Sequence, residues 1–175
     1  MIIIITGASH TGKTILAQRM LEKYKYPYLS IDHLKMGLIR TNNTTLTPYD
    51  DEKLTDYLWP IICEIIKTAI ENKQNLIIEG CYIPYNWRLS FDTEHLNNIK
   101  FICLALSNDY IDKHFDQIID HSNDIEYRIN KDEYTIMSLK IENNKYVNGF
   151  KNENLVIIDS EYENVINSII KNDLF

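Results

Sequence analysis

A short loop with two glycines, set between an apolar run and an amphipathic stretch, constrains the fold of this chain more than any other feature. The apolar run at residues 2–5 is all isoleucine, the composition of a strand that is buried on both faces of a parallel sheet. After the loop, apolar residues recur at helical spacing at Leu16, Ala17, Met20, Leu21 and Tyr24. The segment therefore predicts a strand, a tight turn and a helix, which is the repeating unit of an α/β fold.

The loop has the spacing of a phosphate-binding loop. It fits the pattern G-x-x-x-x-G-K-[ST] with the residues Gly7, Ala8, Ser9, His10, Thr11, Gly12, Lys13 and Thr14. The glycines let backbone N–H groups point at an anion, and the following helix adds the positive end of its dipole. Lys13 would reach the β- and γ-phosphates of a nucleotide, and Thr14 would offer its hydroxyl to Mg²⁺. A turn that only starts a helix is the alternative, but the flanking strand and helix favour a nucleotide triphosphate site.

Size and composition narrow the class of protein. A chain of 175 residues has the size of one α/β domain, so we expect a single domain over residues 1–175. The formal net charge of −7 argues against a nucleic-acid-binding face. No apolar stretch approaches the ~20 residues of a membrane span, and the N-terminal run is too short for a signal peptide. We expect a cytoplasmic monomer or homodimer without membrane contact.

Three cysteines, Cys63, Cys81 and Cys103, are odd in number and widely spaced in apolar surroundings. This pattern is typical of reduced packing residues rather than of a disulfide or a metal set. We therefore expect no zinc site.

The rest of the chain alternates between strand and helix patterns. Further strands are expected at residues 28–31, 76–78, 101–106 and 155–158, and this alternation predicts a parallel sheet. The longest helix is expected to start with Thr47 as N-cap, Pro48 in its first turn and Asp50 in a capping-box-like position. Pro60 is expected to kink this helix near residues 57–59 or to divide it into two. Later helices are expected at residues 108–120, 132–146 and 162–170.

Two acidic residues follow predicted strands and should lie near the phosphate loop. The carboxyl ends of parallel strands meet at one edge of the sheet, where ligands bind. Glu79 ends an apolar strand in the manner of a Walker B segment, so we predict that it holds a water bound to Mg²⁺. Asp32 follows the second strand and could accept the proton of an attacking hydroxyl or orient the acceptor. An N-cap role for Asp32 is the alternative, and the two roles are compatible.

Two long polar connections, residues 41–47 and 121–131, are candidate binding segments, with plain surface loops as the equal alternative. The second contains Arg128, one of four arginines in the chain. A closing loop that brings an arginine to a transferring phosphoryl group lowers the barrier to transfer. We predict a lid at residues 121–131 with Arg128 as a catalytic residue. The alternative is a surface arginine paired with a nearby acid, which leaves Arg40 and Arg88 as candidates.

With these motifs the chain resembles the P-loop small-molecule and nucleotide kinases over nearly its whole length. The resemblance implies a P-loop NTPase fold of three α/β/α layers, with a five-stranded parallel sheet in the order 2-3-1-4-5 and a lid. It also implies an adenine site near residues 159–162. Asp32 between a strand and a helix resembles the chloramphenicol phosphotransferase, gluconate kinase and zeta-toxin branch, in which an acid at this point handles an acceptor hydroxyl. The implied function is transfer of the γ-phosphoryl group of ATP, with Mg²⁺, to a small-molecule hydroxyl acceptor.

The chain departs from the adenylate kinases after the third strand. Those proteins usually carry Asp-Gly-Phe-Pro-Arg there, whereas residues 79–84 read Glu-Gly-Cys-Tyr-Ile-Pro with no arginine directly after them. A nucleoside monophosphate kinase is therefore the alternative enzyme, and a non-catalytic ATP-binding regulatory module is the alternative outside enzymes. A regulatory GTPase is disfavoured, because the segment Asn-Lys-Asp at residues 130–132 lacks the spacing of the guanine-reading motif.

Overall fold

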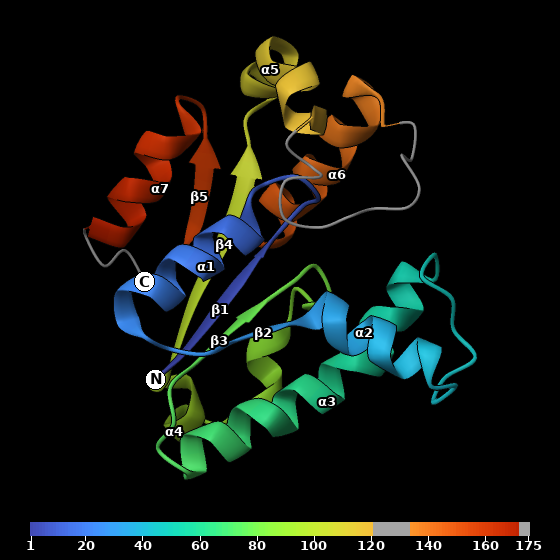
Figure 1. The fold of residues 1–175 in the computed structure, drawn as a ribbon, viewed down its shortest axis with the longest axis vertical. Helices are drawn as coiled ribbons and strands as arrows, with labels where there is room; N and C mark the ends of the chain where they lie inside the picture. Colours follow the sequence, from blue (N-terminus) through green and yellow to red (C-terminus); the bar gives the residue numbers. More distant parts are fainter. Residues whose placement is uncertain (121–133, 172–175) are drawn as a thin grey trace.

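Five strands form one parallel sheet in this computed structural model, which describes residues 1–120 and 134–171. The strands are β1 (Ile2–Gly7), β2 (Tyr28–Ser30), β3 (Leu76–Glu79), β4 (Ile99–Leu106) and β5 (Leu155–Ile158). They lie in the order β2-β3-β1-β4-β5, and every neighbouring pair is parallel (Figure 1). The predicted fold class and strand order are confirmed.

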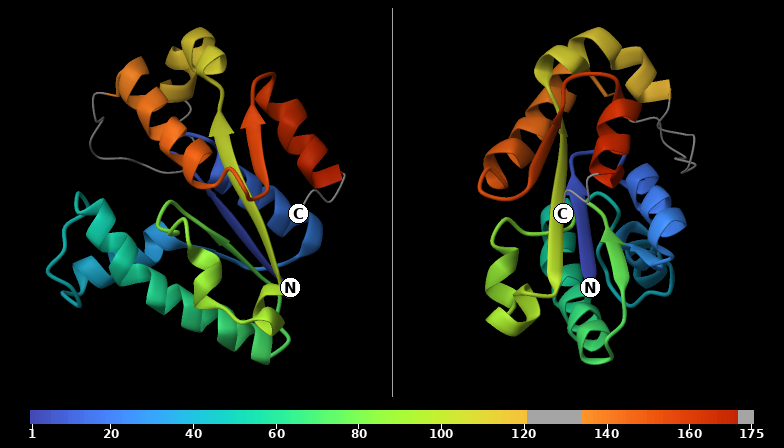
Figure 2. Two further views of the ribbon diagram at one scale, coloured as in Figure 1. Left: turned by 180° about the vertical axis from the view of Figure 1, so that it is seen from behind. Right: turned by 90° about the vertical axis from the view of Figure 1, so that its left-hand side faces the viewer.

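Helices cover both faces of the sheet. They are α1 (Lys13–Tyr24), α2 (Ile31–Arg40), α3 (Asp51–Glu71), α4 (Thr93–Leu96), α5 (Asn108–Asp120), α6 (Ile136–Gly149) and α7 (Tyr162–Lys171), with a 3-10 turn η1 (Trp87–Ser90) before α4. One apolar core joins β1 to α1 and α7, and another joins it to α3. Figure 2 shows α1 and α7 on one side of the sheet and α6 on the other. The molecule has the three predicted layers.

The isoleucine run forms the central strand because its side chains have apolar partners on both faces. Ile2 and Ile4 belong to the core that contains α3, whereas Ile3 and Ile5 belong to the core that contains α1. All of these side chains are fully buried, and burial of each contributes about 1.5–3 kcal/mol. The strand therefore provides a rigid base for the loop that follows it.

The start of α3 differs from the sequence-based expectation. Asp50, rather than Thr47, is the residue before the helix, so the predicted N-cap and first-turn proline are wrong. The carboxylate of Asp50 accepts hydrogen bonds from the backbone N–H and hydroxyl of Thr47 at 2.9 and 2.7 Å. These bonds hold Pro48 in a turn ahead of the helix.

Pro60 does not divide α3, which continues without interruption from Asp51 to Glu71. The predicted pair of consecutive helices is wrong. Proline removes one amide donor, so the carbonyl one turn earlier, that of Asp56, loses its helical partner. Both Asp56 and Pro60 are exposed, and water can solvate that carbonyl.

Other element boundaries shift by a few residues. Ile31 starts α2 instead of ending β2, and α6 starts at Ile136 and runs to Gly149. The later start of α6 follows from a capping box in which Thr135 and Ser138 bond each other's backbone N–H groups. The three cysteines are free, as expected. Within residues 1–120 and 134–171, each helix is too short or too polar to span a membrane.

Candidate active site

The loop between β1 and α1 is closed by two positions that accept only glycine. Gly7 has a φ of 147°, and a Cβ there would lie 2.1 Å from the backbone oxygen of Leu104. Gly12 has a φ of 78°, and a Cβ there would lie 2.0 Å from the hydroxyl of Tyr162. The same hydroxyl donates to the carbonyl of Gly12 at 2.9 Å. The loop is therefore held tightly between β4 and α7.

Within the loop, side chains bond back to the backbone and leave the helix start open. The hydroxyl of Thr11 and the ammonium of Lys13 both donate to the carbonyl of Ala8, at 2.9 and 2.7 Å. Lys13 is the first residue of α1 and is buried. His10 has a φ of 63° and its ring meets that of Tyr134 edge to face at 4.6 Å. The loop thus has the bent form of an anion cradle, with a cation at its base.

Negative groups surround Lys13. Burial opposes its charge, but the field of Cys81, followed by the fields of three carboxylates, raises the pKa of Lys13 above its usual value. Burial also raises the pKa of the Cys81 thiol, which keeps that thiol neutral. The carboxylates of Glu79, Asp32 and Glu142 therefore supply the negative field at neutral pH. Lys13 therefore remains charged at neutral pH.

A carboxylate already occupies one N–H group of the cradle. The backbone N–H of Ser9 donates to Oε1 of Glu142, on helix α6, at 2.7 Å. Sequence reasoning missed Glu142. Its only sequence signal is that it is the sole acidic residue of α6, which does not identify a partner so far away in the chain. In this contact the N–H of Ser9 points outward from the loop and donates to a carboxylate oxygen.

Thr14 and Glu79 lie together beside the cradle, as the sequence predicted. The hydroxyl of Thr14 lies 3.5 Å from Oε2 of Glu79, which is buried at the end of β3. Among the described residues no group of three or more His, Cys, Asp or Glu side chains could hold a metal ion alone. Mg²⁺ prefers oxygen ligands and keeps several waters when it bridges substrate phosphates, so a hydroxyl and one carboxylate fit this ion.

Asp32 lies in the first turn of α2, and Ser30 is the residue before the helix. The N-cap alternative for Asp32 is therefore wrong. Its carboxylate accepts a hydrogen bond from the ammonium of Lys35 at 2.5 Å, and Lys35 also donates to the hydroxyl of Tyr82 at 2.9 Å. The sequence did not point to Lys35 or Tyr82 as neighbours of Asp32. A lysine one turn along a helix usually reaches solvent, and Tyr82 lies far along the chain.

The arginines fall outside this cluster where the structure describes them. Arg88 makes two bonds of 2.7 Å to the carboxylate of Glu153, and Arg19 pairs with Glu163 at 2.7 Å. Arg40 is exposed at the end of α2. Arg128 and the predicted lid at residues 121–131 lie outside the described residues, so both stay predictions. The adenine site at residues 159–162 also stays a prediction, although Tyr162 contacts the loop.

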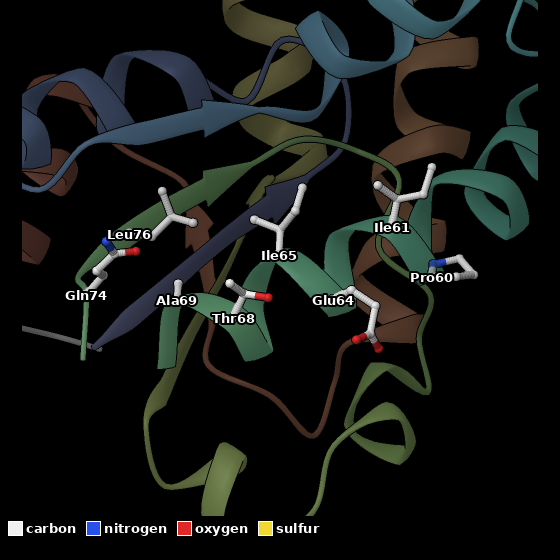
Figure 3. A pocket seen from close by; sticks show the side chains of 8 residues that line it. All are labelled: Pro60, Ile61, Glu64, Ile65, Thr68, Ala69, Gln74 and Leu76. Atoms are coloured by element: carbon white, nitrogen blue, oxygen red, sulfur yellow. The ribbon is translucent and has the colours of Figure 1, made fainter. Parts of the chain in front are cut away.

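An open apolar groove lies elsewhere, between α3 and the start of β3 (Figure 3). Its lining residues are Pro60, Ile61, Glu64, Ile65, Thr68, Ala69, Gln74 and Leu76. None of these lining residues is a lysine or an arginine, so the groove has no cation to bind a phosphate group. Leu76 is the first residue of β3, so the groove is far along the sheet from the loop, which follows the last residue of β1.

Comparison with known proteins supports the fold. No protein-family model matches the chain, and no curated protein matches it. A gluconokinase from Sinorhizobium meliloti 1021 matches with a TM-score of 0.54 and 12% identity, over 97% of this chain and 89% of that chain. A deoxyadenosine kinase from M. mycoides matches with a TM-score of 0.57 and 15% identity, over 98% of each chain. A shikimate kinase from Aquifex aeolicus vf5 matches with a TM-score of 0.51 and 15% identity, over 98% of this chain and 95% of that chain.

Proposed function

We propose that this chain, which has the fold of the P-loop kinases, transfers the γ-phosphoryl group of ATP to a hydroxyl group of a small molecule. The observation that carries the proposal is the pairing of an anion-accepting backbone N–H at Ser9 with the buried, charged Lys13. The proteins of similar fold are named as kinases of small molecules, which supports the same general reaction.

Lys13 and the loop would bind the phosphates of ATP. The N–H groups at the start of α1 point along the helix axis and stabilise negative charge, and Lys13 adds a point charge. In the structure, the ammonium of Lys13 donates to the carbonyl of Ala8, and the carboxylate of Glu142 accepts from the N–H of Ser9. Phosphate oxygens would replace Glu142 at Ser9, because the two anions compete for one donor.

Asp32 would accept the proton of the acceptor hydroxyl. As the acceptor oxygen forms its bond to phosphorus, the bond from phosphorus to the bridging oxygen of ADP breaks and the hydroxyl proton passes to Asp32. The ion pair with Lys35 fixes the orientation of the Asp32 carboxylate. Arg128 remains our candidate for stabilising the charge on the transferring group.

Thr14 and Glu79 would hold Mg²⁺ through the Thr14 hydroxyl and a water on the Glu79 carboxylate. Bound there, the ion would neutralise charge on the phosphates. The burial of Glu79 at the end of β3 fixes its carboxylate relative to the loop.

A non-catalytic ATP-binding module is the second candidate function. It is favoured by the bond from Ser9 to Glu142, because a carboxylate on the cradle weakens nucleotide binding and could couple it to movement of α6. Such a module would bind ATP without passing its phosphoryl group to an acceptor.

The test is whether ATP consumption requires an acceptor. The purified protein is incubated with ATP, Mg²⁺ and single members of a panel of hydroxylated metabolites, nucleosides, nucleotides and aminoglycosides, and ADP release is measured. The kinase proposal expects release above background with at least one acceptor. Binding of MgATP with no acceptor-dependent release across the panel would favour the binding module instead.

A further inference from the structure

Tyr162, the first residue of α7, holds the phosphate loop at its second glycine. Its hydroxyl donates to the carbonyl of Gly12 at 2.9 Å, across 150 positions of the sequence. The packing is close, because a Cβ on Gly12 would lie 2.0 Å from the hydroxyl and 2.4 Å from the ring carbon that carries it. The ring packs where the core around α1 meets the core at the ends of β4 and β5. The hydroxyl therefore has a fixed position relative to the loop.

The carbonyl of Gly12 sets the direction of the neighbouring N–H group. It accepts from Tyr162 and also from the backbone N–H of Leu16, at 3.0 Å, which is the first helical bond of α1. A trans peptide unit is planar, and its C=O and N–H point in opposite directions. The two donors therefore aim the N–H of Lys13 away from the helix, toward the side on which the start of a helix binds anions.

The hydroxyl of Tyr162 acts as a donor. Burial raises the pKa of its phenol, and the charge of Arg19 offsets this effect only in part, so the hydroxyl keeps its proton at neutral pH. A bond donated to a carbonyl polarises the peptide unit and makes the N–H on its other side a better donor. Tyr162 thus orients the N–H of Lys13 and strengthens it as a donor.

Other contacts hold α7 in place without this hydroxyl. Ile166 and Ile169 are buried in the core shared with α1, and Glu163 pairs with Arg19 of α1 at 2.7 Å. Loss of the Tyr162 hydroxyl would therefore leave α7 on the sheet and remove one of the donors to the Gly12 carbonyl. The effect of this bond on the loop can be measured separately from its effect on the fold.

We infer that Tyr162 is a positioning residue for phosphate binding, which aims the N–H of Lys13 at the nucleotide through its bond to the Gly12 carbonyl. The inference rests on the proposed function and adds a residue that acts on the phosphate loop. It differs from the predicted adenine site at residues 159–162, in which Tyr162 would contact the base. Because the hydroxyl acts through the peptide, it affects any ligand that places phosphates in the loop, with or without a base.

Calorimetric titration with two probes tests the inference. MgATP carries a base and phosphates, whereas magnesium tripolyphosphate carries the phosphates alone. Tyr162→Phe should raise the dissociation constants of both probes by the same factor of about five, equal to about 1 kcal/mol, as expected for the loss of one hydrogen bond. Weakening of MgATP alone would assign the hydroxyl to the base, and unchanged binding of both probes would give it a purely structural role. Either result overturns the inference.

Tyr57→Phe is the matched control. The hydroxyl of Tyr57 also donates to a backbone carbonyl at 2.9 Å, that of Asn43, and Tyr57 lies on α3 rather than beside the loop. The control loses the same kind of bond and should leave both dissociation constants unchanged. An equal rise in Tyr57→Phe overturns the inference, since the effect would then not depend on the loop.

NMR of the free protein labelled with carbon-13 and nitrogen-15 tests the geometry without a ligand. The carbonyl carbon of Gly12 and the amide nitrogen of Lys13 belong to the peptide unit that accepts the bond. Both resonances should shift in Tyr162→Phe and stay in place in Tyr57→Phe. Unshifted resonances in Tyr162→Phe overturn the inference.

Titration of the unaltered protein separates this inference from the proposed function. If neither probe binds the unaltered protein, the proposed function and the inference are both contradicted. If MgATP binds and tripolyphosphate does not, the loop does not hold phosphates by itself, which overturns the inference and leaves the kinase proposal standing. Binding of both probes with equal affinity in the unaltered protein and in Tyr162→Phe also overturns the inference alone.

Discussion

The two halves of the candidate site are built in different ways. The phosphate side is one continuous turn from Gly7 to Thr14, shaped by backbone conformation and anchored on the fully buried β1. The acceptor side is a chain of side-chain contacts among α2, the start of α3 and the segment after β3. The first arrangement depends on the backbone conformation at Gly7 and Gly12, whereas the second depends on contacts between individual side chains.

Glu142 connects the phosphate side to the rest of the molecule. It reaches Ser9 from α6, whose buried Asn143 also accepts the N–H of Leu106 at 2.8 Å. The bond from β4 to Asn143 thus anchors α6 next to the residue that reaches the loop. Under the proposed function, phosphates at the loop would replace the bond between Ser9 and Glu142 and so remove a contact of α6.

The largest effect is expected on the phosphate side. Lys13→Ala should lower acceptor-dependent ADP release by a factor of about 100 to 1,000, the usual consequence of losing one group that stabilises transition-state charge. The melting temperature, measured in parallel by circular dichroism, should report a folded protein. Lys67→Ala, which removes a partly exposed lysine of α3 paired with Glu64, is the control and should keep full activity. Unaltered turnover in Lys13→Ala would contradict the kinase proposal.

The next largest effects are expected from substitutions of Asp32 and Glu79, which should change different kinetic quantities. Asp32→Asn should lower kcat by about 100-fold, as for loss of a general base, while the dissociation constant of MgATP changes by less than about twofold. Glu79→Gln should instead weaken ATP binding at limiting Mg²⁺. Steady-state kinetics with calorimetry at several Mg²⁺ concentrations distinguishes the two. Equal losses of ATP affinity in both variants would show that the halves of the site are not independent.

A smaller effect of opposite sign is expected at Glu142. Glu142→Gln removes a negative charge that competes with phosphate oxygens at Ser9, so MgATP should bind about fivefold more tightly, equal to about 1 kcal/mol. Calorimetry provides the dissociation constant. Glu64→Gln, which changes an exposed acid on α3, should have no effect. Weaker binding in Glu142→Gln would mean that the carboxylate supports the nucleotide rather than competing with it.

The smallest effect concerns the stability of the acceptor side. Tyr82→Phe removes the hydroxyl that joins Lys35 to Asp51, at a cost of about 1 kcal/mol. For a chain of this size the melting temperature should fall by about 2–4 °C. Tyr85→Phe is the control, because Tyr85 is exposed and its described contact is a ring packed edge to face on Phe150. Equal melting temperatures for both variants would indicate that the contact chain adds no stability.

The contrast between the halves also explains what the sequence could predict. The sequence predicts Lys13, Thr14 and Glu79 as site residues because the loop pattern is contiguous and the strand before Glu79 is apolar throughout, and the structure places Thr14 and Glu79 side by side, while their roles stay predictions. The strand order came from the resemblance and was confirmed. The expected N-cap at Thr47 is wrong because Asp50, three residues later, is also a capping-type residue, and its carboxylate binds the N–H and hydroxyl of Thr47, which keeps Thr47 in the turn ahead of the helix.

The partners on the acceptor side had no local signal. Lys35 and Tyr82 meet although 47 positions separate them, and a lysine on an amphipathic helix is normally expected to face solvent. The contact of Glu142 with Ser9 spans 133 positions. Such pairs depend on how α2, α3 and α6 lie against the sheet, which periodicity alone does not encode.

Phosphorus-31 NMR of a reaction with ATP, Mg²⁺ and an acceptor tests the central claim most directly, because it follows where the γ-phosphoryl group goes. The account predicts a new phosphate ester resonance on the acceptor, growing as ADP grows, and its loss in Lys13→Ala. Growth of inorganic phosphate alone in the unaltered protein, or the same ester yield in Lys13→Ala, would contradict phosphoryl transfer at this loop.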